Sequence, residues 1–138
     1  MRQVVVDTNI VLDVLVFEEE AAAPLRDALR AGEVRWCVTP PMRVELERVL
    51  DYPMIARRRA QRALSVSEVL DQFDAWADVQ PIAAKAPYTC KDPDDQGFID
   101  LACALGVELI SKDKAVLAMR NRLLRLGVTV SRRWTAGE

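Results

Sequence analysis

The sequence predicts an α/β fold, one three-layer αβα domain built on a five-stranded, mostly parallel sheet. Short apolar runs rich in β-branched residues alternate with longer segments of helical spacing along the whole chain. The length of 138 residues suits one domain, and neither a repeat nor a linker divides it. We therefore predict a single domain over residues 1–131 and a short, frayed C-terminal tail over residues 132–138.

Five short apolar runs are expected to form the strands. They lack a strict alternation of apolar and polar residues, which is typical of parallel strands that are covered on both faces. The first run stops at a carboxylate, Asp7. In chain order the predicted strands are residues 3–6, 34–38, 77–82, 107–111 and 128–130.

Segments with apolar residues three and four positions apart are expected to form the helices. Gly32 and Gly106 stand where glycine commonly ends a helix, and Thr39 followed by two prolines is a typical helix start. The predicted helices cover residues 10–17, 18–32, 39–50, 67–77, 92–105 and 114–126, and a further helical stretch begins at the basic window 57–62.

The composition excludes several classes of protein and of catalytic site. The chain is 51% hydrophobic and 29% charged, and no apolar run is long enough to span a bilayer. Its three cysteines are far apart and lack zinc-site spacing, which fits a reducing, cytoplasmic location. Histidine is absent, so triads and zinc sites that need imidazole are ruled out. Any chemistry must use carboxylates, hydroxyls, lysine or a metal bound by oxygen.

Two acidic residues come at or soon after the ends of predicted strands. Asp7 directly follows the first strand, and Asp113 lies shortly after the apolar part of the fourth. In an open parallel sheet, ligands bind beyond the carboxyl ends of the strands. We therefore expect the two carboxylates to share one edge of the sheet.

Two further acids lie on the apolar faces of predicted helices. Glu45 is three residues after Met42 and four before Val49, so it shares their inward face. A carboxylate there is costly unless it is paired, and a salt bridge to a buried arginine would also explain it. Asp95 lies in the first turn of its helix on the side of Phe98, where helix capping explains an acid almost as well.

The remaining acids near these positions are expected to have lesser roles. Asp92 is predicted to cap the helix over residues 92–105 and to be an auxiliary candidate for the site. Asp94 is predicted to be an exposed charge of the first helical turn. We expect Asp13 and Asp100 at the surface.

Four convergent carboxylates require cations, and hard oxygen ligands of this kind suit Mg²⁺ or Mn²⁺. Such ions can activate water for attack on a phosphodiester, so hydrolysis of nucleic acid is the favoured reaction. The net charge is −2, but 15 of the 19 basic residues are arginines. Arg57, Arg58, Arg59 and Arg62 fall in one window, which is compatible with an RNA-binding patch and equally with a solvated helix face.

Four motifs resemble the PIN-domain family, especially its VapC-like toxin ribonuclease branch, and the resemblance covers nearly the whole chain. In order, the matching segments are residues 4–9 with an Asp-Thr-Asn signature, residues 44–50, residues 92–95 followed by Leu101-Ala102, and residues 109–113. The step of eighteen residues from Asp95 to Asp113 fits the spacing of the family. That spacing favours Asp95 over Asp92 and Asp94.

The resemblance implies a function, a cofactor and partners. It implies that Asp7, Glu45, Asp95 and Asp113 are catalytic and bind Mg²⁺ or Mn²⁺, with Thr8, Asn9 and Ser111 shaping the site. Ser111 stands where threonine is common in the family. The implied substrate is RNA, the implied partner is a cognate antitoxin, and a homodimer is an option.

Two other functions fit parts of the pattern. A phosphatase of the haloacid-dehalogenase type also begins with a strand and an aspartate, but it needs a second aspartate two residues later, where this chain has Asn9. A PIN-like module that binds RNA or a protein without cleaving anything is the alternative that the sequence leaves open.

Overall fold

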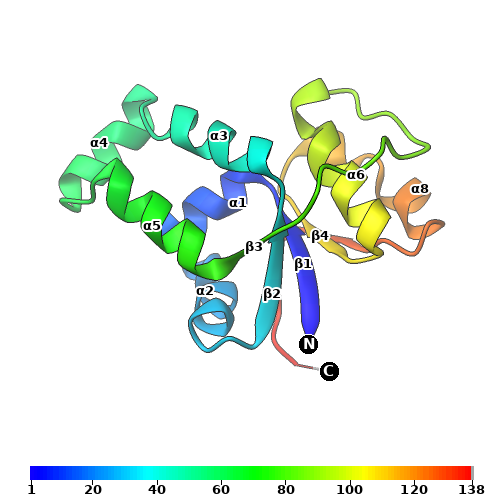
Figure 1. The fold of residues 1–138 in the computed structure, drawn as a ribbon, viewed down its shortest axis with the longest axis horizontal. Coiled ribbons are helices and arrows are strands. Elements are labelled where there is room, and N and C mark those ends of the chain that lie inside the picture. Colours follow the sequence, from blue (N-terminus) through cyan, green and yellow to red (C-terminus); the bar gives the residue numbers. More distant parts are fainter. Residues whose placement is uncertain (138) are drawn as a thin grey trace.

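A sheet of five strands, all parallel, lies at the centre of the computed structural model, which describes residues 1–137. The strand order is β3-β2-β1-β4-β5 (Figure 1). The strands are β1 (Arg2–Val6), β2 (Val34–Val38), β3 (Ala77–Val79), β4 (Glu108–Ile110) and β5 (Val130–Ser131). The predicted α/β class and all five strands are confirmed, although β3 ends three residues earlier than predicted.

The helices occupy every connection between these strands. Between β1 and β2 lie α1 (Thr8–Leu12), the π-helix η1 (Asp13–Phe17), the 3-10 turn η2 (Glu20–Ala22) and α2 (Ala23–Arg30). Between β2 and β3 lie α3 (Pro40–Val49), α4 (Pro53–Gln61) and α5 (Val66–Trp76). The 3-10 turn η3 (Pro93–Asp95) and α6 (Gln96–Leu105) precede β4, and α7 (Lys114–Leu117) and α8 (Arg120–Leu124) precede β5. In Figure 1, α1 to α5 gather on one side of β1, and α6 and α8 on the other.

The central strand β1 sets the position of the edge at which the acidic residues lie. Val4 pairs with Trp36 of β2, and Val6 pairs with Ile110 of β4. The Asp7 N–H donates to the Ile110 carbonyl at 3.1 Å, so the ladder continues to the residue after β1. The carboxyl ends of β1 and β4 are therefore side by side.

One predicted helix is interrupted in the structure, and two others begin differently from the prediction. Glu18 takes a left-handed conformation with φ +50°, so the helix expected from residue 18 starts only at Glu20. The helix expected over residues 114–126 breaks into α7 and α8 at Met119, whose side chain is 2% exposed and packs in the core. The helix expected from Asp92 opens with the 3-10 turn η3 before α6 begins.

The predicted C-terminal tail is attached to the domain at Trp134, whereas its other described residues, 132, 133 and 135–137, are exposed. Glu138 lies outside the described residues. Trp134 is 5% exposed, and the Arg2 guanidinium lies 4.5 Å from the centroid of its ring. Arg2 also donates from Nη1 to the Thr135 carbonyl at 2.8 Å. A buried aromatic ring and a cation over its face hold this segment, so the expectation of a frayed tail is wrong for Trp134.

The helices among the described residues are not of the membrane-spanning kind. None of the helices within residues 1–137 combines the length and the hydropathy that a bilayer crossing requires.

Candidate active site

Asp7 lies at the junction of β1 and α1 and is almost fully buried. It is the N-cap of α1, and its Oδ1 accepts a hydrogen bond from the Ile10 N–H at 3.0 Å. Its Oδ2 accepts a short hydrogen bond from the Ser111 hydroxyl. Burial raises the pKa of Asp7 above its ordinary value, and these two hydrogen bonds oppose the shift because they stabilise the ionised form.

Asp113 starts α7 and is positioned by its backbone as well as by its carboxylate. Its Oδ1 accepts from the Ala115 N–H at 2.8 Å, which is the N-cap interaction of α7. Its own N–H donates to Ser111 Oγ at 3.0 Å. The fully buried Ser111 therefore joins the two strand ends, because its hydroxyl donates to Asp7 while it accepts from Asp113.

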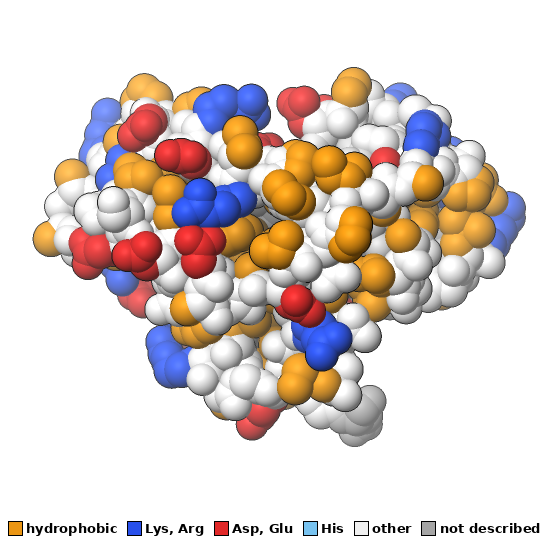
Figure 2. Space-filling view, viewed as in Figure 1, with side chains coloured by type: hydrophobic (Ala, Val, Ile, Leu, Met, Phe, Trp, Pro, Cys, Tyr) orange, Lys and Arg blue, Asp and Glu red, His pale blue; other side chains and the backbone are white. Residues whose placement is uncertain are grey.

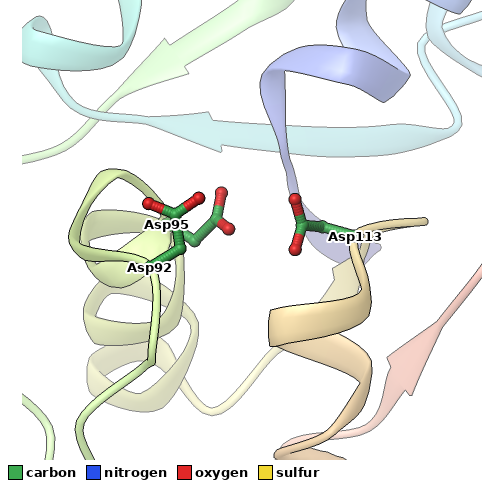
Figure 3. Close-up of side chains that lie close together, drawn as sticks. All are labelled: Asp92, Asp95 and Asp113. Atoms are coloured by element: carbon green, nitrogen blue, oxygen red, sulfur yellow. The ribbon is translucent and has the colours of Figure 1, made fainter.

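Three carboxylates converge at this edge of the sheet. One oxygen from each of Asp92, Asp95 and Asp113 lies within 4.8 Å of the others. Asp92 and Asp95 approach from the turn before α6, and Asp113 approaches from the start of α7 (Figure 3). Asp92 also caps the η3 turn, since it accepts from the Asp94 N–H at 3.0 Å. Asp92, predicted as an auxiliary, lies in this cluster, whereas Asp7 and Glu45 do not belong to it.

Asp95 has the most perturbed environment of the three. Its Oδ2 is buried without a hydrogen-bond partner among residues 1–137. Desolvation, followed by the charges of Asp113 and Asp92, raises the pKa of Asp95 to about 7. A buried oxygen without a donor, next to two carboxylates, is the environment that a bound cation would relieve. The donor set consists of oxygens alone, so the residues fit a hard divalent ion.

Glu45 faces the same cleft from α3. Burial raises the pKa of Glu45, while a hydrogen bond with the Thr8 side chain and the charge of Arg48 oppose that shift. Within the described residues, no ion pair involves Glu45. The alternative of a structural salt bridge to a buried arginine is therefore wrong, and Glu45 remains a half-buried carboxylate turned toward the site.

A cleft of about 120 Å³ connects Glu45 with Asp7 and Asp95. Its polar lining consists of Thr8 and Asn9 as well as the three carboxylates. Its apolar and aromatic lining consists of Leu12, Val49, Tyr52, Ile55 and Phe98. A hollow of about 140 Å³ adjoins the cleft through Glu45 and Phe98. Figure 2 shows hydrophobic side chains gathered over the middle of this face, between α3 and α6.

Two aspartates that were expected at the surface are engaged in the structure, so that expectation is wrong. Asp100 is half-buried, and its Oδ1 accepts at 2.8 Å from both the Ala86 N–H and Gln96 Nε2. Asp13 is 8% exposed and forms an ion pair with Lys112. The apolar residues on both sides of Asp13 were the signal for its burial, because a surface aspartate rarely interrupts a continuous buried run.

The arginine window divides into two pairs. Arg59 donates from Nε to the Leu50 carbonyl at 3.0 Å and from Nη1 to the Leu64 carbonyl at 3.2 Å. Arg62 pairs with Glu18 at 2.8 Å and donates to the Val16 carbonyl at the end of η1. These two guanidinium groups thus donate hydrogen bonds to backbone carbonyls that lie outside α4.

The other two arginines of the window are less constrained. Arg57 is exposed, and Arg58 has a single hydrogen bond, at 3.2 Å, to the nearby Gln61. Only this pair is available for phosphate contacts without breaking intramolecular bonds to the backbone.

Comparisons with known proteins identify a family and similar solved structures. A family model described as "PIN domain" matches residues 3–115, a stretch that contains Asp7, Glu45, Asp95 and Asp113. Among solved structures, the chain is similar to a PilT N-terminus domain protein from the hyperthermophilic archaeon Sulfolobus solfataricus P2. That similarity has a TM-score of 0.48 and 16% sequence identity, and it covers 93% of this chain and 84% of the other. No curated protein matches the sequence.

Proposed function

The chain belongs to the PIN domain family, and from this premise we propose that it is a metal-dependent endoribonuclease. PIN domains are typically metal-dependent nucleases that act on nucleic acids. The finer proposal is that Mg²⁺ or Mn²⁺ supports hydrolysis of phosphodiester bonds in single-stranded RNA. The VapC-like resemblance of the four motifs supports RNA as the substrate.

One observation carries the proposal. The carboxylates of Asp92, Asp95 and Asp113 meet within 4.8 Å, and one buried oxygen of Asp95 has no donor among the described residues. An all-oxygen donor set favours Mg²⁺ or Mn²⁺ over softer metals. Such an ion, when bound, lowers the pKa of a coordinated water and stabilises the leaving oxygen.

The side chains of the cleft have separate roles in this proposal. Asp95 and Asp113, together with Asp7, would hold the metal, and Asp92 would complete the cluster. Glu45 also lines the cleft, where it would complete the metal site or orient a water. Ser111 and Thr8 keep carboxylates in place by hydrogen bonding, the first with Asp7 and the second with Glu45. Asn9 is exposed at the rim, where its amide is accessible to a substrate.

The apolar part of the cleft lining supports an unpaired strand as the substrate. Tyr52 is 48% exposed and lines the same cleft as Ile55 and the carboxylates of Asp7, Glu45 and Asp95. Single-stranded nucleic acids bind proteins largely by stacking bases on such side chains. Bases in a duplex are already stacked on one another, so these apolar and aromatic side chains favour RNA that is single-stranded at the cleavage position.

A toxin role follows from the same resemblance and is part of the proposal. We expect a cognate antitoxin to cover the cleft and expect the protein to act in the cytoplasm, with homodimerisation as an option. Two large, exposed hydrophobic side chains line the cleft or the adjoining hollow, namely Tyr52 at 48% and Ile82 at 71%. A partner that covered these side chains would block access to Asp95. Growth arrest on expression, relieved by co-expression of a small protein encoded next to this chain, would support this role.

The decisive experiment is cleavage of a mixed RNA pool by the purified protein. Cleavage is expected with Mg²⁺ or Mn²⁺, and it should be lost in EDTA and in the Asp7→Asn and Asp113→Asn variants. Asp74→Asn is the matched control, because Asp74 is an exposed carboxylate paired with Arg43 at 2.8 Å, away from the cleft. Cleavage that persists in EDTA would contradict the mechanism. Binding of RNA without cleavage under any metal would favour the non-enzymatic module.

A further inference from the structure

Lys112 separates two residues of the candidate active site. It follows Ser111, which donates to Asp7, and precedes Asp113, which belongs to the acidic cluster. These three residues form the whole connection between β4, which ends at Ile110, and α7, which begins at Lys114. The backbone of this short connection therefore determines where the Asp113 carboxylate lies relative to Asp7.

The Lys112 side chain is held by a carboxylate that is far away in the sequence. Its Nζ lies 2.5 Å from Asp13 Oδ2, and the side chains are 45% and 12% exposed, respectively. Asp13 begins the π-helix η1, whose wide turn is closed by a hydrogen bond from the Glu18 N–H to the Asp13 carbonyl. A buried carboxylate requires a cation or donors, and among residues 1–137 Lys112 is its one ion-pair partner.

Two adjacent contacts thus join the β4–α7 connection to the segment that begins at Asp7. The Ser111 hydroxyl bonds Asp7 at the start of α1, and Lys112 pairs with Asp13 at the start of η1. One contact would leave the connection free to rotate about it, whereas two contacts from neighbouring residues restrict that rotation. A π-turn within a helix is often found at a functional site, and here it places Asp13 within reach of the Lys112 ammonium.

We propose that Asp13 is a positioning residue of the active site, which acts through Lys112 to fix the connection that carries Ser111 and Asp113. This inference rests on the proposed metal-dependent function, because Asp13 would affect activity by keeping the carboxylates of the acidic cluster correctly spaced for the metal. Residues behind the direct ligands of a metal usually change its affinity when they are replaced. Asp13 is neither in the acidic cluster nor in the cleft lining, so its effect must be transmitted through the pair.

The test measures Mn²⁺ affinity and local backbone protection in Asp13→Asn, Lys112→Gln and the double variant. Each single variant is expected to weaken Mn²⁺ binding by about 10- to 100-fold, and the double variant no more than either single one. Lys112→Arg keeps a cation paired with Asp13, so this variant should bind Mn²⁺ with an affinity close to that of the wild type. Hydrogen exchange at the Asp113 N–H, which bonds Ser111 Oγ, should become faster in Asp13→Asn. The control Asp74→Asn removes the exposed pair with Arg43 and should change neither quantity.

The outcomes separate this inference from the proposed function. A folded Asp13→Asn variant with wild-type Mn²⁺ affinity and wild-type exchange at Asp113 would overturn the positioning role, even if its unfolding free energy fell. A wild-type protein that binds no Mn²⁺ would overturn the proposed metal site instead, and the exchange measurement would still decide whether Asp13 fixes the connection. If Asp13→Asn fails to fold, the double variant, which leaves no unpaired charge, decides the question in the same way.

Discussion

The Ser111 hydroxyl, at the end of β4, donates a hydrogen bond to Asp7 Oδ2, at the end of β1. The same hydroxyl oxygen accepts from the Asp113 N–H at 3.0 Å, so one buried hydroxyl connects two strand ends and two acidic residues. Asp7 would otherwise be a buried carboxylate that depends on the Ile10 N–H alone. The hydroxyl therefore affects both the charge of Asp7 and the position of Asp113.

Replacing Ser111 tests this role. Ser111→Ala removes a donor that stabilises ionised Asp7 and leaves the Asp113 N–H without its acceptor. The free energy of unfolding should fall by about 1 to 3 kcal/mol, as expected when buried polar groups lose their partner. The pKa of Asp7, already raised by burial, should rise further. Urea unfolding and NMR titration of the carboxyl carbon measure the two effects. Ser111→Thr keeps the hydroxyl and is the control, and an unchanged Asp7 pKa in Ser111→Ala would contradict the argument.

Asp95 makes the stability of the metal-free protein depend on pH. Desolvation and the neighbouring carboxylates raise its pKa from 3.8 to about 7 in the folded state. The folded protein thus holds the proton more tightly than the unfolded chain does. The stabilising effect is complete below pH 3.8 and is lost as the pH rises through about 7.

Asp95→Asn should therefore reduce this pH dependence. In EDTA at pH 8, the variant should have a higher melting temperature than the wild type, because its amide does not repel Asp92 and Asp113. The two proteins should converge near pH 4, where Asp95 is largely protonated in the folded state. Mg²⁺ should stabilise the wild type at pH 8 and stabilise the variant much less. Parallel pH profiles for the two proteins in EDTA would show that Asp95 does not titrate as described.

Much of the fold followed from local patterns in the sequence. Buried parallel strands appear as short apolar runs, and Gly106 marks the end of α6 because its φ of +66° suits glycine. The boundary near Glu18 was predicted, although the next helical turn starts two residues later than expected. The interruption at Met119 was missed, since it depends on how the chain packs after it turns. Helical spacing continues across Met119, so nothing in the sequence near it distinguishes a break from a continuous helix.

The candidate site was predictable to the extent that strand ends determine it. Asp7 and Asp113 follow β1 and β4, and the carboxyl ends of parallel strands lie at one edge of a sheet. The direct pairing of β1 with β4 was not predicted and comes from the structure. Asp92 was underestimated, because an aspartate before a helix is explained by capping, and in the structure Asp92 caps its turn and joins the cluster as well. The apolar neighbours of Asp13 signalled its burial, but no local pattern indicates its ion pair. Its partner Lys112 lies 99 positions away in the sequence.

The four arginines of the basic window should respond differently to substitution. Arg59→Ala should lower the free energy of unfolding by about 1.5 to 3 kcal/mol, since its guanidinium donates to the carbonyl of Leu50, at the end of α3, and to that of Leu64, in the turn before α5. Arg57→Ala and Arg58→Ala should change it by less than about 0.5 kcal/mol, because neither side chain is tied to the backbone. Chemical denaturation measures these differences, and Arg30→Ala on α2 serves as an exposed-arginine control.

The same variants test the interaction with RNA. In an Asp7→Asn background, which should keep the RNA intact, the double variant Arg57→Ala with Arg58→Ala should weaken RNA binding. The slope of log affinity against log salt should become shallower by about 0.7 for each phosphate of a single strand that the variant no longer neutralises. Fluorescence anisotropy at several salt concentrations gives this slope. A slope equal to that of the Arg30→Ala control would identify the window as a solvated helix face.

Trp134 tests whether the C-terminal segment belongs to the domain. Its ring is 5% exposed, and Arg2, at the start of β1, lies over it while also pairing with Glu108 of β4 at 3.1 Å. Trp134→Ala should therefore cost about 3 to 5 kcal/mol of unfolding free energy, the usual range for a buried tryptophan. A frayed tail would instead give a change below about 0.5 kcal/mol. Asp92, Asp95 and Asp113 of the acidic cluster all lie outside this segment, so the folded variant should keep its Mn²⁺ affinity. A large loss of affinity at unchanged stability would mean that the segment acts on the site rather than on the core.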